Sequence, residues 1–189
     1  MSYVVWHSMY QDGLCALGAL EGVPRDEEIL KGISRAEGFP EDAWYEMRAD
    51  FPKDVQIPDN VYSMIHHVVS ERLRKVLEPA LGASRVELLP VKIKNHKGRF
   101  APGSFFVMNP LDVIDCIDVA ASGGVHNDLD PTQLVSVQQL VLKELPGEPA
   151  MFRPVGWTRL ILVRSDVVDR LQEADLEGLV FWELDEFRG

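Results

Sequence analysis

The alternation of apolar and polar residues predicts strands in several parts of the chain. Tyr3–His7 (YVVWH) has the β-branched and aromatic content of a short strand. Residues 85–94 alternate apolar and polar side chains, and Pro90 among them indicates a sheet edge or a bend. A turn (NHKG) separates them from a second apolar strand at 104–109. These two segments predict a hairpin.

A helical spacing of apolar residues is clearest between residues 59 and 81. Asp59 can cap the start of such a helix, and basic residues fall in its C-terminal half, where positive charge suits the helix dipole. The apolar positions form a stripe with the period of a helix. They are Val61, Met64, Ile65, Val68, Val69, Val76 and Leu77. The pattern predicts a long amphipathic helix that packs one face on a sheet.

The other segments are shorter. A helix is predicted at about 165–174 with Ser165 as its cap, and a turn of helix near 24–33. Further elements are predicted as strands at 133–145, 157–164 and 179–184 and a loop at 119–131. Grouped strands with few helices indicate the α+β class. We therefore predict a mainly antiparallel or mixed sheet with helices at about 59–81 and 165–174.

Length and composition indicate a globular protein. A chain of 189 residues suits one domain, 1–189, and its 46% hydrophobic and 26% charged residues are typical of a packed core. The N-terminal residues do not resemble a signal peptide, and no window approaches the roughly 20 apolar residues that span a bilayer. Cys15 and Cys116 lie among apolar residues, which favours buried reduced thiols over a disulfide. We expect a soluble cytoplasmic protein.

Acidic residues outnumber basic ones, but unevenly. The net charge is −11, yet residues 60–100 hold eight basic and only three acidic side chains. An acidic surface repels nucleic-acid phosphates and anionic membranes, and it attracts a basic protein at low salt. The alternative is that the acidity serves only solubility. Direct binding of nucleic acid or membrane is disfavoured.

Three aspartates follow the apolar strand at 104–109. Asp112, Asp115 and Asp118 recur every three residues, and no Lys or Arg lies between Phe100 and Leu142. On a helical turn these carboxylates would share one side, where they could bind Mg²⁺ or Ca²⁺. Their spacing matches neither a calcium loop nor a recognised metal-dependent nuclease motif. A structural or surface role is favoured, and neither a metal nor a cofactor is expected.

Other catalytic patterns are not recognised. His66 and His67 are adjacent, and adjacent residues of a helix point about 100° apart, so core or boundary histidines are favoured over a zinc site. No serine has a nucleophile-elbow context, and no glycine-rich loop has the spacing of a phosphate-binding motif. The residues themselves give no reason to expect an enzyme.

Arg153 lies among apolar residues in the sequence MFRPV. A partly buried guanidinium requires a carboxylate or backbone carbonyls as partners. We predict that Arg153 pairs with Asp115 or Asp118. The alternative is a surface arginine whose stem covers apolar neighbours.

Several motifs follow one another between residues 85 and 184. A strand and turn (LPVKIKNHKG) precede an aromatic strand that runs into a V-D-C-x-D-like segment (FFVMNPLDVIDCIDVAAS). A polar loop and a strand pair lead to an FR motif (MFRPVGW), and a short helix precedes an L-x-G-x-x-F ending (LEGLVFWEL). In this order they resemble immunity-protein family eleven of bacterial polymorphic toxin systems, of the myxobacterial type. On this resemblance the chain divides into a loosely matched part, 1–84, and a family-like part, 85–189.

The resemblance implies a binding protein that neutralises a cognate toxin in the cytoplasm of the producing cell. The matched residues would be structural framework: Asp115, Cys116, Asp118, Phe152, Arg153, Gly178 and Phe181. A nuclease toxin has a basic phosphate-binding cleft, which carboxylates can occupy. The toxin-binding candidates are then the acids outside the matched set: Asp112, Asp128, Asp130, Glu173, Asp175, Glu177, Glu183, Asp185 and Glu186.

Two rival functions stay open beside the immunity hypothesis. The chain could be an acidic regulatory module that binds another basic protein. It could also be an enzyme of unrecognised class, which would need a pocket lined by titratable groups of shifted pKa. An exposed final strand could pair across a two-fold axis, so a homodimer is a further alternative.

Overall fold

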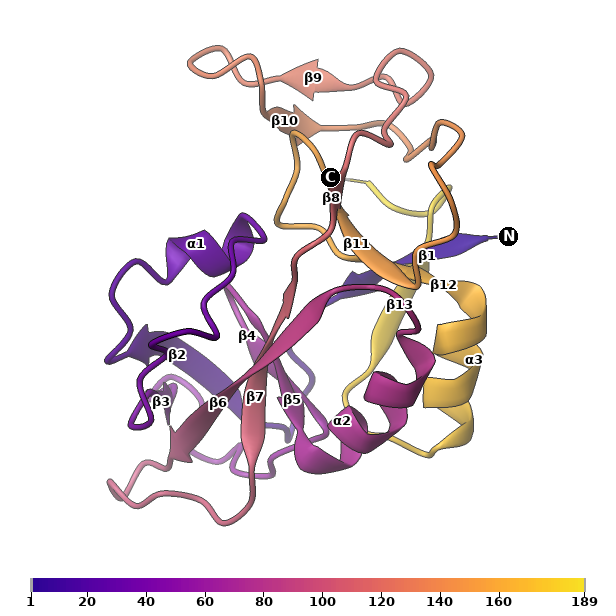
Figure 1. The fold of residues 1–189 in the computed structure, drawn as a ribbon. Helices are drawn as coiled ribbons and strands as arrows, with labels where there is room; N and C mark the ends of the chain where they lie inside the picture. Colours follow the sequence, from indigo (N-terminus) through magenta and orange to yellow (C-terminus); the bar gives the residue numbers. More distant parts are fainter. Residues whose placement is uncertain (1, 189) are drawn as a thin grey trace.

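Strand β7 (Phe105–Pro110) is buried at every residue in the computed structural model, which describes residues 2–188. Phe105 and Val107 belong to one hydrophobic cluster, and Phe106 and Met108 belong to another. Successive side chains of a strand point to opposite faces, so an unbroken apolar run suits a strand that is covered on both sides. β7 therefore connects two layers of the molecule (Figure 1).

Six strands close into a barrel around Phe105 and Val107. In barrel order they are β2 (Ala16–Glu21), β3 (Trp44–Met47), β6 (Val86–Lys94), β7, β5 (His67–Ser70) and β4 (Asn60–Ser63). The β2–β4 and β3–β6 pairs are parallel, and the other pairs are antiparallel. Closure leaves this sheet without a free edge.

A second, five-stranded sheet brings the two ends of the chain together. Its order is β13 (Val180–Glu183), β1 (Tyr3–His7), β12 (Leu162–Arg164), β11 (Met151–Pro154) and β8 (Val113–Ile114). Alternate residues of β1 pack in different clusters, Val4 and Trp6 in one and Tyr3 and Val5 in another. This sheet is therefore also covered on both faces.

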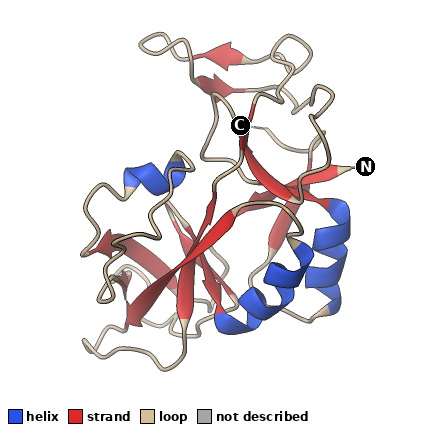
Figure 2. Cartoon of the chain, in the orientation of Figure 1, coloured by secondary structure: helices blue, strands red, loops and turns tan. Residues whose placement is uncertain are grey.

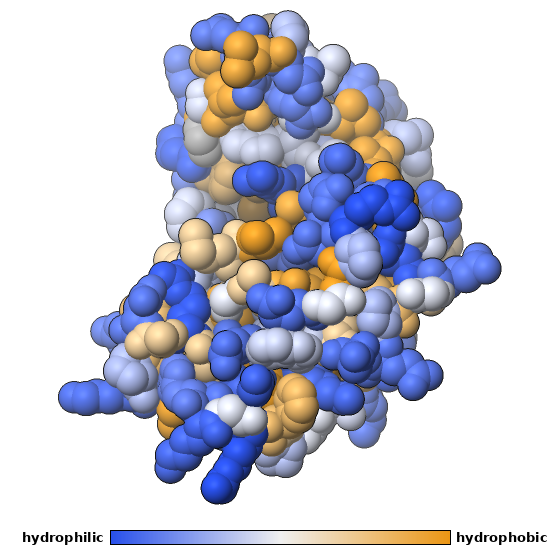
Figure 3. All heavy atoms as spheres, turned by 90° about the vertical axis from the view of Figure 1, so that its left-hand side faces the viewer, coloured by the Kyte–Doolittle hydropathy of each residue, from blue (hydrophilic) through white to orange (hydrophobic). Residues whose placement is uncertain are grey.

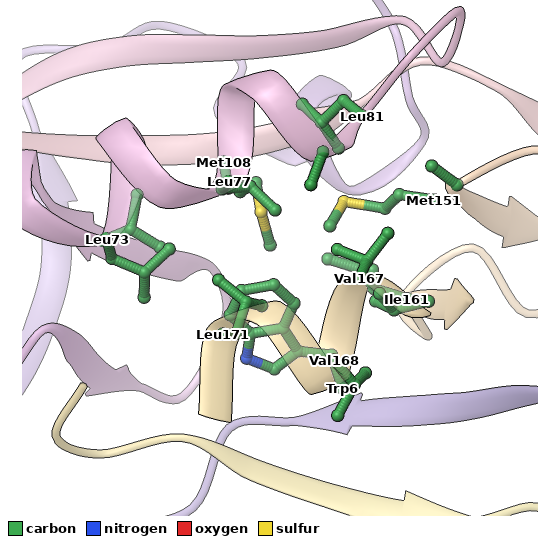
Figure 4. Packing of buried hydrophobic residues seen from close by; sticks show 14 of the residues in the cluster. Trp6, Leu73, Leu77, Leu81, Met108, Met151, Ile161, Val167, Val168 and Leu171 are labelled. Atoms are coloured by element: carbon green, nitrogen blue, oxygen red, sulfur yellow. The ribbon is translucent and has the colours of Figure 1, made fainter. Parts of the chain in front are cut away.

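Two short helices pack together beside the barrel and the five-stranded sheet (Figure 2). They are α2 (Glu71–Leu77), which continues into a 3-10 turn (Glu78–Ala80), and α3 (Ser165–Glu173); α1 (Glu27–Leu30) lies elsewhere, beside the barrel. Figure 4 shows side chains of α2 and α3 packed with Met108 of β7 and Trp6 of β1. Burying one such leucine or valine contributes about 1.5–3 kcal/mol. This shared cluster joins the two layers.

A two-stranded ribbon projects from the molecule at the top of Figure 1. It consists of β9 (Val125–His126) and β10 (Leu134–Ser136), which pair with each other. Because an isolated ribbon of two strands is only marginally stable, its attachment matters. Leu134 packs in a third cluster with Phe152 of the five-stranded sheet, and this contact anchors the ribbon.

The long helix predicted at 59–81 is wrong. Strand β4, a turn, strand β5 and only then the short helix α2 occupy these residues. Val61 and Val68 are partners across the β4–β5 hairpin and lie in the barrel core, while Val69 packs toward the helices. The valines recur with a helical spacing by coincidence, and their β-branched side chains suit strands.

The predicted helix cap is wrong as well. Ser70 is the N-cap of α2, and its hydroxyl accepts a hydrogen bond from the Leu73 N–H. Asp59 instead accepts hydrogen bonds from the Ser70 hydroxyl at 2.6 Å and from Arg72 at 3.0 Å. The acid thus holds the start of the helix from the neighbouring strand.

The α+β class is overturned by this architecture, which is mostly β and built on a closed barrel. Several local predictions are confirmed, among them strand β1, the β6–β7 hairpin and a helix near 165–174, although Arg164 rather than Ser165 is its N-cap. Pro90 lies in the part of β6 that pairs only with β7, before β3 joins at Lys92. Its missing N–H therefore interrupts no ladder.

The cysteine prediction is confirmed. Cys15 and Cys116 are free and buried, and burial raises the pKa of each thiol to about 12. Among residues 2–188 no helix has the length and apolar character needed to cross a membrane.

Gly178 allows the chain to enter β13 close to the barrel. Its φ of +85° lies in the left-handed region, and a Cβ atom there would collide with the carbonyl oxygen of Asn60. The Asn60 side chain also donates a hydrogen bond to the Gly178 carbonyl at 2.8 Å. Only glycine satisfies both the backbone angle and this close approach.

We expect Gly178→Ala to lower the free energy of unfolding by about 3 kcal/mol, because backbone strain and a clash with a fixed carbonyl add together. Gly13 has nearly the same φ, +86°, with nothing within 4 Å of the added methyl group. The matched variant Gly13→Ala should lose only about 1–2 kcal/mol. Urea unfolding measures both, and equal losses would contradict the close-approach argument.

Candidate functional site

An acidic groove lies between the end of β13 and the segment 139–147. Its volume is about 860 Å³. Four exposed acids line it: Glu144, Glu148, Glu183 and Asp185. The Leu140 N–H donates a hydrogen bond to the Leu184 carbonyl at 3.0 Å, so one wall of this groove is tied to the other.

The charges of the acidic groove are largely uncompensated. Lys143 is its only basic lining residue, and its ammonium lies 2.8 Å from the Asp115 carboxylate. Within residues 2–188 none of the four groove acids forms an ion pair. Like charges held together create a potential that attracts a cationic group over about 8–10 Å at physiological salt. The groove is therefore suited to basic side chains.

Two of the predicted candidate acids, Glu183 and Asp185, line this groove, and Glu186 lies exposed in the turn that follows. Two others, Asp128 and Asp130, lie in the loop of the β9–β10 ribbon. That loop carries apolar side chains as well, visible at the top of Figure 3. Leu129, between the two aspartates, is 96% exposed. The ribbon loop thus combines acidic and apolar side chains on a projection.

Three more candidates lie at the end of α3 and in the segment that follows it. Glu173 and Asp175 are exposed, and Arg72 donates to the backbone carbonyl of Asp175 at 2.8 Å. The Glu177 carboxylate accepts hydrogen bonds from the Gln56 amide at 2.7 and 2.9 Å. None of the three lines the acidic groove. Glu177 has an evident structural role in joining this segment to the barrel side.

The three aspartates after β7 do not converge. The Asp112 carboxylate accepts hydrogen bonds from Arg85, from Nε at 2.8 Å and from the backbone N–H at 2.9 Å. Asp115 binds Lys143, and Asp118 accepts the Ala121 N–H at 2.9 Å. The segment is extended where a helical turn would have gathered them. Among the described residues no group of three or more His, Cys, Asp or Glu is placed to hold a metal.

The predicted framework residues differ in burial. Cys116 and Phe152 are fully buried in the third cluster. Phe181 packs on Trp6 with 5.3 Å between ring centroids. Asp115, by contrast, has a side chain that is 73% exposed, so it packs against little.

Arg153 is 2% exposed, but its predicted pairing with Asp115 or Asp118 is wrong. Its Nε donates to the Pro110 carbonyl at 3.1 Å, and one terminal nitrogen donates to the Thr158 carbonyl at 2.6 Å. Within the described chain no carboxylate forms an ion pair with it. Burial lowers the pKa of Arg153 to about 10. The guanidinium is therefore a buried cation satisfied by backbone oxygens.

His66 and His67 are buried, as expected, although in the turn and at the start of β5 and not within a helix. Nδ1 of His66 lies 2.8 Å from the Tyr45 hydroxyl. Nδ1 of His67 is sealed from solvent and has no hydrogen-bond partner in the described structure. Burial, then the positive charge of Arg153, lowers the pKa of His67 to about 3. Its imidazole is neutral at physiological pH.

Two groove residues were missed by the sequence interpretation, Glu144 and Glu148. Glu144 lies at the end of the segment predicted as strands, 133–145, and Glu148 lies among the polar residues that follow. Only the pairing of chain ends brings this segment opposite residues 183–185. In the sequence, the excess of acidic over basic residues after residue 100 was the one feature that pointed to these two glutamates.

Comparison with known families gives one finding. A family model described as "Immunity protein family (Imm11)" matches residues 25–186. This match begins well before residue 85, where the recognised motifs start. A search of the curated proteins found no match.

Arg153→Ala should lower the free energy of unfolding by about 3–5 kcal/mol, because it leaves a cavity and two buried carbonyls without donors. Asp115→Asn should cost less than about 1 kcal/mol, because its only ion pair is exposed. Thermal or urea unfolding of both variants measures the difference. If Asp115→Asn lowered the free energy of unfolding as much as Arg153→Ala, the result would support the predicted ion pair between Arg153 and Asp115.

His67 should make the protein less stable in acid. Because the pKa of His67 in the folded state, about 3, lies below its ordinary value of 6.5, the unfolded chain takes up a proton first as pH falls. Stability should therefore decline from about pH 6.5 toward pH 3, by roughly 1 kcal/mol per pH unit from this group. His67→Gln should flatten that decline in urea titrations. The variant His96→Gln, changed at an exposed site, should retain the decline. If stability falls with pH as steeply in His67→Gln as in the unchanged protein, His67 is not its cause.

Proposed function

The chain belongs to the Imm11 immunity protein family, and on that premise we propose that it binds and neutralises a cognate nuclease toxin through the acidic groove. The observation that carries the immunity function is the family match, which covers most of the chain. The groove, whose four acids form no ion pair among the described residues, supports this mode of binding. Inhibition takes place in the cytoplasm of the producing cell.

The nuclease assignment rests on charge complementarity. A nuclease binds phosphates with Lys and Arg, and carboxylates can satisfy the same side chains. Steering between opposite charges brings association to about 10⁸ M⁻¹s⁻¹ or faster at low salt. The groove acids Glu144, Glu148, Glu183 and Asp185 would accept a protruding basic segment of the toxin, and Glu186 lies beside them.

The ribbon loop supplies a second contact in this proposal. Interface energy concentrates in apolar anchors surrounded by polar groups. Leu129 is such an anchor between Asp128 and Asp130. Asn127 accepts hydrogen bonds from the N–H groups of Leu129 and Asp130. The loop is thereby ordered before binding, which reduces the entropy lost on association.

The rival functions lead to different observations. An acidic module for another basic protein would lack a neighbouring gene for a large toxin with a variable C-terminal domain. An enzyme would need titratable groups of shifted pKa gathered in a pocket where substrate can bind. Membership in an immunity family favours binding over catalysis.

We expect co-expression of this protein to protect cells from the neighbouring toxin domain. The triple variant Glu144→Gln, Glu183→Gln, Asp185→Asn should bind that domain at least 100-fold more weakly, because each close charge pair is worth about 1.5 kcal/mol or more. Affinity should also fall as salt rises from about 50 to 500 mM. Calorimetry or surface plasmon resonance on the purified pair measures the affinity of the variant and its dependence on salt.

The matched control neutralises three exposed acids near α1, Glu27, Glu37 and Glu41. It makes the same change in net charge and should retain most of the affinity. Equal weakening by both triple variants would overturn the groove as the binding site and leave the immunity function intact. Equal killing with and without this protein would overturn the immunity function itself.

A further inference from the structure

A hollow of opposite character to the acidic groove lies where the end of β1 meets the β4–β5 turn. This histidine pocket has a volume of about 190 Å³. Its polar lining residues are His7, Ser8, Ser63, His66, His67 and Arg159. No Asp or Glu lines it, in a chain that has 30 acids and 19 bases.

Donors around the histidine pocket lack good acceptors. The N–H groups of Ile65 and His66 reach only the Ser63 hydroxyl, at 3.4 and 3.5 Å. The Ser8 hydroxyl donates to the Ser63 carbonyl at 3.5 Å. Well-formed hydrogen bonds are about 2.7–3.2 Å long, and buried polar groups are normally satisfied. His67 is 8% exposed, and its Nδ1 has no hydrogen-bond partner among the described residues.

One arginine lines the histidine pocket, and a second lies buried nearby. Arg159 is exposed and forms no ion pair within residues 2–188. Burial lowers the pKa of both His66 and His67, and the charge of the buried Arg153 adds to this lowering. Asp26, at the start of α1, is the acid that acts on the pocket. Its backbone carbonyl lies 3.4 Å from Nε2 of His66, and its charge opposes the lowering of that pKa.

We propose that the histidine pocket binds a small oxyanion, the carboxylate or phosphate group of a ligand. Arg159 offers a planar guanidinium for two parallel hydrogen bonds at its rim. The N–H groups of Ile65 and His66 and the Ser8 hydroxyl supply further donors. At about 30 Å³ per water molecule, the volume suffices for a phosphate group and its nearest waters. An anion there would also compensate the buried charge of Arg153, and this site is independent of the proposed toxin binding.

Nuclear magnetic resonance of the five histidine rings tests the proposal on the intact protein. Sodium phosphate, and separately sodium acetate, replaces sodium chloride at constant ionic strength. The ring signals of His7, His66 and His67 should shift and saturate, while those of the exposed His96 and His126 should not. Saturation by phosphate alone would assign a tetrahedral oxyanion, and saturation by both anions would extend the site to carboxylates.

Arg159→Gln should weaken phosphate binding at least tenfold, because it removes the charge at the rim. Arg170→Gln makes the same charge change on the exposed side of α3 and is the matched control. Shifts that do not saturate, or that affect all five rings alike, overturn the site. Equal weakening by the two variants also overturns it, since general screening would then explain the effect.

Discussion

On one face of β7, Phe105 and Val107 pack inside the barrel, and on the other, Phe106 and Met108 pack against α2 and α3. A strand with both faces covered cannot slip by one residue without exchanging its two sets of side chains. The register of β7 therefore fixes the barrel and the helical layer together. Through that layer it also fixes the five-stranded sheet, on which both proposed binding sites depend.

The sequence predicts elements where a single local pattern decides the structure. The alternation in β1 and in the β6–β7 hairpin is of this kind, and so is the short stripe of α3. Residues 59–81 could not be read in the same way, because valines of two strands and leucines of a short helix together imitate one helical stripe. Barrel closure depends on pairings such as β3 with β6, between segments about 50 residues apart, which no local pattern reports.

The site was predictable in charge but not in shape. Acids at 183–186 attract attention in the sequence, whereas Glu144 and Glu148 become relevant only because the chain ends pair and place them across a groove. Arg153 was expected to be at least partly buried, since apolar residues flank it, and it is 2% exposed. Its partners are the backbone carbonyls of Pro110 and Thr158. Because every residue has a backbone carbonyl, the sequence does not indicate which ones bind a buried arginine.

The position of β1 in its sheet has a consequence for synthesis. Among the described strands, β1 pairs with β12 and β13, so it stays unpaired during synthesis until both of them have been made. The barrel needs nothing beyond residue 110 for its strand pairing and can assemble earlier. The acidic groove, whose wall includes residues 183–185, can form only after those residues have been made. A chain truncated before β13 would thus contain every strand of the barrel and no groove.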